Sequence, residues 1–199
     1  LAAHQQKFGS TEDLLVGLQL THSGRFCRPN SKMLEPRIAY HHPLLDAKFG
    51  IAAEDESVVW TDDQLEDLIE SYVRAAQLAQ RTGYRFVDVK CCHGYLLHEF
   101  LSARYRAGKY GGDYAGRTRL LRTIIQRIQQ ACSELMILVR LSFFDAPPFV
   151  ASDEVGVPMD FEHLLPYKLG FGCNESNPLE LDLTEPLQLV RDLRDLGVA

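Results

Sequence analysis

The chain has 199 residues, of which 46% are hydrophobic and 24% are charged, and these values are typical of one globular domain. Its formal net charge of −6 argues against nucleic acid as the main partner, because phosphate binding needs a basic surface. No apolar run reaches the ~20 residues of a membrane helix, so we expect a small-molecule partner rather than a membrane.

The first predicted element is a buried strand at residues 14–20, where the sequence is almost continuously apolar. Residues 26–60 contain three prolines and no sustained period, so they predict a long loop, and such loops are usually functional or mobile. A helix is predicted to follow. Thr61 and Gln64 have the spacing of a capping box, and apolar residues then recur at helical spacing up to Gly83, which suits a helix end.

The second predicted strand, residues 86–90, leads into three proton-active side chains: Lys90, His93 and Tyr95. A turn after the strand could bring all three into one pocket, because they lie so close together in sequence. Barrel and open α/β enzymes place their chemistry at the C-terminal ends of strands. The sequence therefore predicts an active centre here.

A second amphipathic helix is predicted at residues 114–131, followed by a buried strand at 135–139. Residues 143–183 are rich in proline and glycine and predict a long insertion, for which a lid is one conceivable role. A last helix should begin with Thr184 as its N-cap and Pro186 in its first turn. The alternation of strands and helices predicts a parallel sheet.

Four segments resemble, in the same order, the motifs of the Old Yellow Enzyme family of flavin-dependent NAD(P)H:acceptor oxidoreductases. These segments are residues 19–25, 83–96, 110–119 and 139–142. The chain departs from the family pattern at Lys90, where the family has a histidine, and at Gly116, where it usually has an asparagine. The four motifs occur in the family's order, and the resemblance covers residues 14–145.

The resemblance implies a partial (β/α)₈ TIM barrel, from about strand three to the helix before strand six. Residues 1–199 would form a single FMN-binding domain with long loops at 26–60 and 143–183. Such a barrel typically has ~250 residues, so we expect the chain to be the middle of a longer protein. The alternative is a complete small α/β protein that shares the pattern.

The resemblance also implies an FMN-dependent oxidoreductase that takes electrons from NADH or NADPH and passes hydride to a small unsaturated acceptor. His93 and Lys90 are then expected to hold the acceptor's carbonyl oxygen, and Tyr95 to donate a proton to its α-carbon. The residue types suit these roles, because donors at the oxygen stabilise developing negative charge and a phenol can protonate an enolate.

Structural roles remain open for the same residues. His93 could cap the following helix while Tyr95 only packs its ring. Lys90 could select an anionic substrate, or it could extend to solvent and pair with an acidic neighbour.

Gln19 and Arg140 are the expected flavin contacts. The resemblance places the glutamine at the pyrimidine edge of FMN and the arginine near its N1–C2=O locus, where positive charge stabilises the anionic reduced flavin. For Arg140 the alternative is a structural salt bridge. His22 and Arg25 are further cofactor-binding candidates, since the family's matching turn borders the flavin and the contacts between subunits, which also suggests a homo-oligomer.

The five cysteines are odd in number and irregularly spaced, which suits a reducing, cytoplasmic location better than a disulfide framework. Cys91 and Cys92 are expected to be small buried residues. His41 and His42 are adjacent, but no second cluster of matching spacing exists, so no metal site is predicted.

Two further functions fit the same residues. A flavin dehydrogenase or amine demethylase would use the same strand ends, because either half-reaction passes through the flavin. The third interpretation is a catalytically inactive barrel-derived module, in which Lys90 marks the loss of the substrate site.

Overall fold

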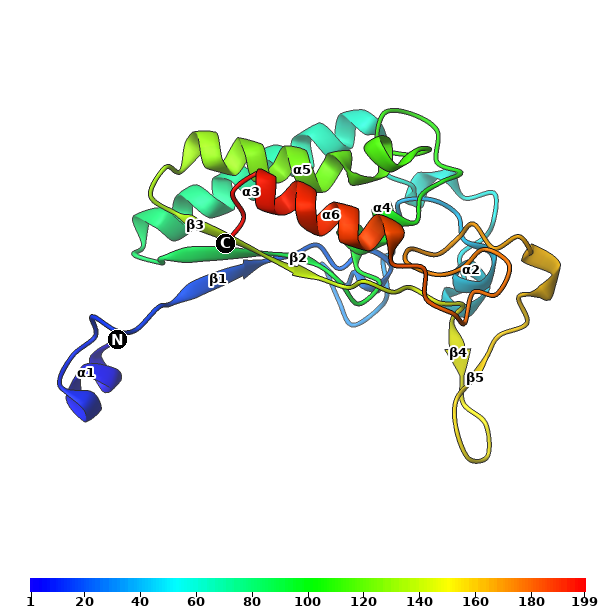
Figure 1. The fold of residues 1–199 in the computed structure, drawn as a ribbon, viewed down its shortest axis with the longest axis horizontal. Helices are drawn as coiled ribbons and strands as arrows, with labels where there is room; N and C mark the ends of the chain where they lie inside the picture. Colours follow the sequence, from blue (N-terminus) through cyan, green and yellow to red (C-terminus); the bar gives the residue numbers. More distant parts are fainter.

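The computed structural model describes residues 1–199 and shows a three-stranded parallel sheet with helices against one of its faces (Figure 1). The strands, in spatial order, are β1 (Gly17–Leu20), β2 (Phe86–Cys91) and β3 (Met136–Leu141). The helices of this layer are α3 (Asp62–Arg81), the short α4 (Leu96–Leu101), α5 (Tyr114–Ala131) and α6 (Thr184–Asp195). The predicted parallel sheet with alternating helices is confirmed.

The remaining elements lie outside this layer. They are α1 (Ala2–Phe8), η1 (Gly24–Phe26), α2 (Pro43–Phe49), η2 (Glu56–Val58), β4 (Phe149–Val150), β5 (Val157–Pro158) and η3 (Glu162–Leu164). In Figure 1, α1 stands apart from the sheet and the β4–β5 hairpin projects from the body. None of the helices has the length and apolar character that crossing a lipid bilayer would need.

The two faces of the sheet differ in burial. On β2, Val87, Val89 and Cys91 are fully buried against the helices, whereas the alternating residues Asp88 and Lys90 are only half-buried. Strand side chains point alternately to opposite faces, so the helices cover one face and the other stays open. The open face is also visible in Figure 1, where no helix lies beneath β1 and β2.

The helix predictions hold best where the local signal is strong. The capping box of α3 is present, with Gln64 N–H donating to Thr61 Oγ1 at 3.2 Å, and Gly83 has the left-handed φ of +89° expected after a helix end. The predicted helix at residues 114–131 is also confirmed as α5.

Several predictions are wrong in detail. The strand predicted at residues 135–139 is β3, which spans Met136–Leu141. The first strand begins at Gly17 rather than at residue 14. The 26–60 segment is not wholly irregular, because Pro43 opens α2 and the ring nitrogen Nδ1 of His42 accepts the Leu45 N–H as its cap. The N-cap of α6 is Leu183 rather than Thr184, whose N–H is bound instead by the carboxylate of Asp182.

Gly116, in the first turn of α5, faces the carbonyl oxygen of Gly111. A Cβ atom at this position would lie 2.0 Å from that oxygen, which is far inside van der Waals contact. The chain thus has a steric reason for glycine at the position where the family usually has asparagine. The loop before α5 comes too close to the helix for any side chain.

We expect Gly116→Ala to destabilise the protein by about 1–3 kcal/mol, because backbone atoms must move to relieve the overlap. Without a clash, the same change inside a helix would stabilise by roughly 1 kcal/mol. Urea unfolding would measure the difference. Gly156→Ala is the control, since a Cβ there meets its nearest neighbour at an ordinary 3.5 Å. Unchanged or increased stability of Gly116→Ala would contradict the steric explanation.

Candidate functional site

Three of the sequence-predicted site residues lie together on the open face of the sheet. Lys90 and Arg140 are register partners on β2 and β3, and Gln19 and Asp88 are register partners on β1 and β2. The side-chain amide of Gln19 donates from Nε2 to Asp88 Oδ2 at 2.6 Å. Register partners point to the same side of a parallel sheet, and Asp88 and Lys90, two residues apart on β2, share a face. Gln19, Lys90 and Arg140 therefore lie on one side of the sheet, and together they are called the polar row.

The two cations of this row have no carboxylate partner. Neither Lys90 nor Arg140 has an Asp or Glu oxygen within 4.0 Å. Asp88, the acidic residue of the same face, is instead hydrogen-bonded by Gln19. The structural alternatives of an acidic neighbour for Lys90 and a salt bridge for Arg140 are therefore not found.

The ring of Tyr95 lies beside this row. Lys90 Nζ is 3.8 Å from the centroid of the Tyr95 ring, and the centroid of Phe26 is 5.5 Å away. A cation over an aromatic face contributes about 0.5–2 kcal/mol, depending on its exposure to water. The Tyr95 hydroxyl makes no hydrogen bond within the protein, so the ring is held while its polar end stays available.

The turn that carries His93 has an unusual backbone. His93 has a φ of +61°, the only left-handed value at a residue other than glycine, and Gly94 follows with +66°. A left-handed residue with a side chain costs roughly 1–2 kcal/mol. Two hydrogen bonds hold the turn: His93 N–H donates to Ser142 Oγ at 3.4 Å, and Gly94 N–H donates to His98 Nδ1 at 3.0 Å.

His98 can accept that bond because its imidazole is neutral. Burial, together with the charge of nearby His93, lowers the pKa of His98 to about 4. The imidazole of His93 itself is exposed. It does not cap the following helix, because the N-cap of α4 is Tyr95 and no side chain caps it.

Arg25 lies in a buried cluster rather than on the open face. Its side chain is 1% exposed and donates to Glu99 Oε1 at 2.5 Å, to Asp46 Oδ1 and to the Tyr40 carbonyl oxygen. Glu99 also accepts the Ala39 N–H at 3.0 Å. This cluster ties the loop after β1 to α4. These bonds involve all three guanidinium nitrogens of Arg25. Its cofactor-binding role stays a prediction.

Glu99 and Asp46 were not among the predicted site residues. A fully buried arginine requires countercharge, so partners for Arg25 are expected once its burial is known. The sequence shows neither that burial nor the partners, which lie 74 and 21 residues away.

His22 contacts Trp60 edge to face, with ring centroids 5.2 Å apart, and its Nδ1 accepts the Gly24 N–H at 3.2 Å. Burial, and then the charge of Arg37, lower the pKa of His22, so its ring is neutral. It borders a hollow of about 620 Å³ between the loops after β1 and helix α3. Its role at the cofactor also stays a prediction.

The other expected residues have structural contacts. Cys91 and Cys92 are buried and free, as predicted. His41 bonds to Asp46 at 2.6 Å.

The polar row offers groups that could hold a planar ligand with an imide edge. The Oε1 atom of Gln19 has no partner, its second amide hydrogen is free, and the exposed Arg140 adds positive charge. An acceptor, a donor and a cation in one row match an imide that gains negative charge on reduction.

Comparison with known proteins gives a consistent result. The sequence model of the NADH:flavin oxidoreductase / NADH oxidase family matches residues 10–153. The NADPH dehydrogenase of Bacillus subtilis is 27% identical over 147 residues, which are 71% of this chain and 40% of that protein. The NADH:flavin oxidoreductase FG08077 of Gibberella zeae is 30% identical over 151 residues, 69% of this chain and 37% of that protein. The chain thus spans about 40% of the length of these relatives.

Two solved structures share the fold. The Old Yellow Enzyme from Pichia sp. AKU4542 has a TM-score of 0.51 and 29% identity, covering 63% of this chain and 35% of that one. The 6-hydroxypseudooxynicotine amine oxidase from Pseudomonas geniculata N1 has a TM-score of 0.54 and 27% identity. The match covers 71% of this chain and 20% of that one. The predicted partial (β/α)₈ barrel is confirmed.

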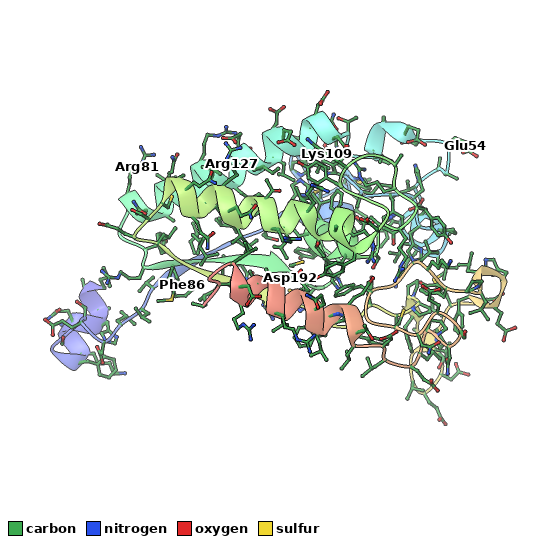
Figure 2. All side chains as sticks on the ribbon, turned by 45° about the horizontal axis from the view of Figure 1, so that its top comes forward. Glu54, Arg81, Phe86, Lys109, Arg127 and Asp192 are labelled. Atoms are coloured by element: carbon green, nitrogen blue, oxygen red, sulfur yellow. The ribbon has the colours of Figure 1, made fainter.

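The buried cluster makes a stability prediction. Glu99→Ala should cost about 3–5 kcal/mol, because it breaks the buried ion pair with Arg25 and leaves Arg25 Nε and the Ala39 N–H without their acceptor. Glu70→Ala is the matched control: it removes the surface ion pair with Arg127, whose side chains are both more than 40% exposed, and should cost at most ~1 kcal/mol. Figure 2 shows Arg127 at the helical surface. Similar losses in urea unfolding for the two variants would contradict the assignment.

Proposed function

Because the chain belongs to the NADH:flavin oxidoreductase / NADH oxidase family, we propose that the protein is an FMN-dependent oxidoreductase reduced by NADH or NADPH. The observation that supports this most strongly is the polar row of Gln19, Lys90 and Arg140, with the Tyr95 ring beside it. Residues 1–199 would form a single FMN-binding domain of barrel type.

Gln19 and Arg140 would hold the flavin. Asp88 binds one amide hydrogen of Gln19, which fixes the orientation of the amide and leaves Oε1 and the second N–H for the imide edge. Arg140 would offset the negative charge that the ring gains on reduction. FMN would supply the chemistry of hydride transfer, which no side chain of the chain offers.

His93 and Lys90 would bind the acceptor. Both present N–H donors at the strand end, and donors at a carbonyl oxygen stabilise the negative charge that develops as the β-carbon takes hydride. The ammonium of Lys90 can do this strongly, since no carboxylate of the protein neutralises it. The same charge would favour an acceptor with an anionic group.

Tyr95 would complete the reaction by donating its phenolic proton to the α-carbon. Its hydroxyl is free of other bonds, and its ring is fixed between Lys90 and Phe26. A positioned general acid of this kind typically contributes 10²–10⁴-fold to the rate.

The remaining assignments are proposals of the same kind. His22 and Arg25 would border the cofactor and the contacts of a homo-oligomer. A reducing, cytoplasmic location is supported by five cysteines that are all buried and free.

A second candidate function is flavin-dependent oxidation of an amine. The observation that favours it is the likeness, at 27% identity and a TM-score of 0.54, to a protein described as an amine oxidase. The polar row and Tyr95 do not discriminate between the two directions, because both pass through the same flavin.

The experiment that tests the proposal follows the two half-reactions separately. In the FMN-loaded protein, Tyr95→Phe should leave reduction of the flavin by NADPH unchanged and slow its reoxidation by 2-cyclohexenone about 10²–10⁴-fold. Tyr105→Phe, at a ring that is 67% exposed, is the control and should match the wild type. Equal reoxidation rates in wild type and Tyr95→Phe would contradict the role of Tyr95. No turnover in any variant would favour the inactive module.

A further inference from the structure

A small cavity of about 230 Å³ lies beside the His93–Gly94 turn. Its walls come from the loop after β1, from helix α2 and the segment before it, and from the segment after β3. Three aromatic residues, Phe26, Tyr40 and Phe49, and the acidic residue Asp145 are among the residues that line it. Phe26 and Phe49 meet edge to face with centroids 4.9 Å apart.

Asp145 has no cationic partner in the protein. Its Oδ2 accepts a hydrogen bond from Ser102 Oγ at 3.2 Å, whereas Oδ1 makes none, and no Lys, Arg or His nitrogen lies within 4.0 Å. Burial raises the pKa of Asp145 to about 6, and the Ser102 bond offsets this only in part. The protein therefore leaves the charge of this carboxylate largely uncompensated.

The other titratable groups around the cavity do not supply the missing cation. His93 lines it too, but no Asp or Glu oxygen lies within 4.0 Å of its ring nitrogens. Arg25 also lines it, but its guanidinium is already bound to Glu99 and Asp46, two carboxylates for one cation. The ring of His42 is neutral, because burial and the charge of Arg25 lower its pKa to about 4. With Asp145 ionised, the cavity is therefore electronegative.

We propose that this cavity binds a small organic ammonium ion, held by Asp145 Oδ1 and by the rings of Phe26 and Phe49. A carboxylate and aromatic rings are the two kinds of partner that recognise an ammonium, through a charge-assisted hydrogen bond and through cation–π contacts. A metal ion fits less well, because nowhere in residues 1–199 do three His, Cys, Asp or Glu side chains gather as metal ligands. This site goes beyond the proposed function, since it requires no flavin.

The test uses benzylammonium and its neutral analogue benzyl alcohol as probes. Titration of the purified protein by calorimetry, at a pH above the pKa of Asp145, should give binding about tenfold or more tighter for benzylammonium. Asp145→Asn should remove this preference, because the amide keeps the shape and loses the charge. Asp160→Asn, at a carboxylate whose side chain is 80% exposed, is the control and should retain it.

Equal binding of the two probes would overturn the proposal and leave an ordinary apolar cavity. Preference for benzylammonium that survives in Asp145→Asn would overturn it as well. If circular dichroism shows that Asp145→Asn does not fold, the variant Phe49→Leu decides. It should weaken the binding of benzylammonium a few-fold more than the binding of benzyl alcohol. Equal effects on the two probes would refute the site. Flavin is not part of the readout, so a failure of FMN binding is distinguishable from a failure here.

Discussion

The in-register pairing of three parallel strands is the constraint on which the site depends. It aligns Gln19 with Asp88 and Lys90 with Arg140, so that residues far apart in sequence share one face. A slip of one residue in β2 would turn Asp88 and Lys90 toward the helices and expose Val87 and Val89. The hydrophobic contacts of β2 with α3 and α4 therefore fix the polar row as firmly as they fix the core.

The loops beyond the strands add core residues such as Tyr40 and Phe171, and polar contacts hold them as well. The turn at His93 and Gly94 is fixed by Ser142 and His98, and the loop after β1 is fixed to α4 through Arg25 and Glu99. Buried charges and a left-handed residue are costly, and they persist only where the surroundings determine them fully. Their concentration beside Tyr95 agrees with a functional strand end.

The sequence analysis succeeded where the signal is local or strongly periodic. The capping box of α3 and the apolar stripe of α5 were predictable, and the second and third strands were predicted to within two residues of β2 and β3. The short helix α2 was not predictable, because a segment with several prolines and one capping residue shows no helical periodicity. The predicted N-cap of α6 was wrong by one residue, since the carboxylate of Asp182, outside the helix, accepts the Thr184 N–H.

The contacts that sequence could not give are those between distant segments. Arg25 meets Glu99 across 74 residues, and the cavity beside Asp145 is assembled from three separate loops. Gly116 could be seen to depart from the family pattern, but its cause, the carbonyl of Gly111, became visible only in the fold.

Titration of the protein with FMN, followed by fluorescence quenching, tests the central claim most directly. In the full-length protein, the wild type should bind FMN, and Gln19→Leu and Arg140→Met should each weaken binding about tenfold or more, as expected for hydrogen bonds to a charged or strongly polar edge. Arg194→Met, at a side chain that is 73% exposed, should bind like the wild type. Absence of FMN binding in the wild type, or equal affinity in all variants, would contradict the assignment of the polar row.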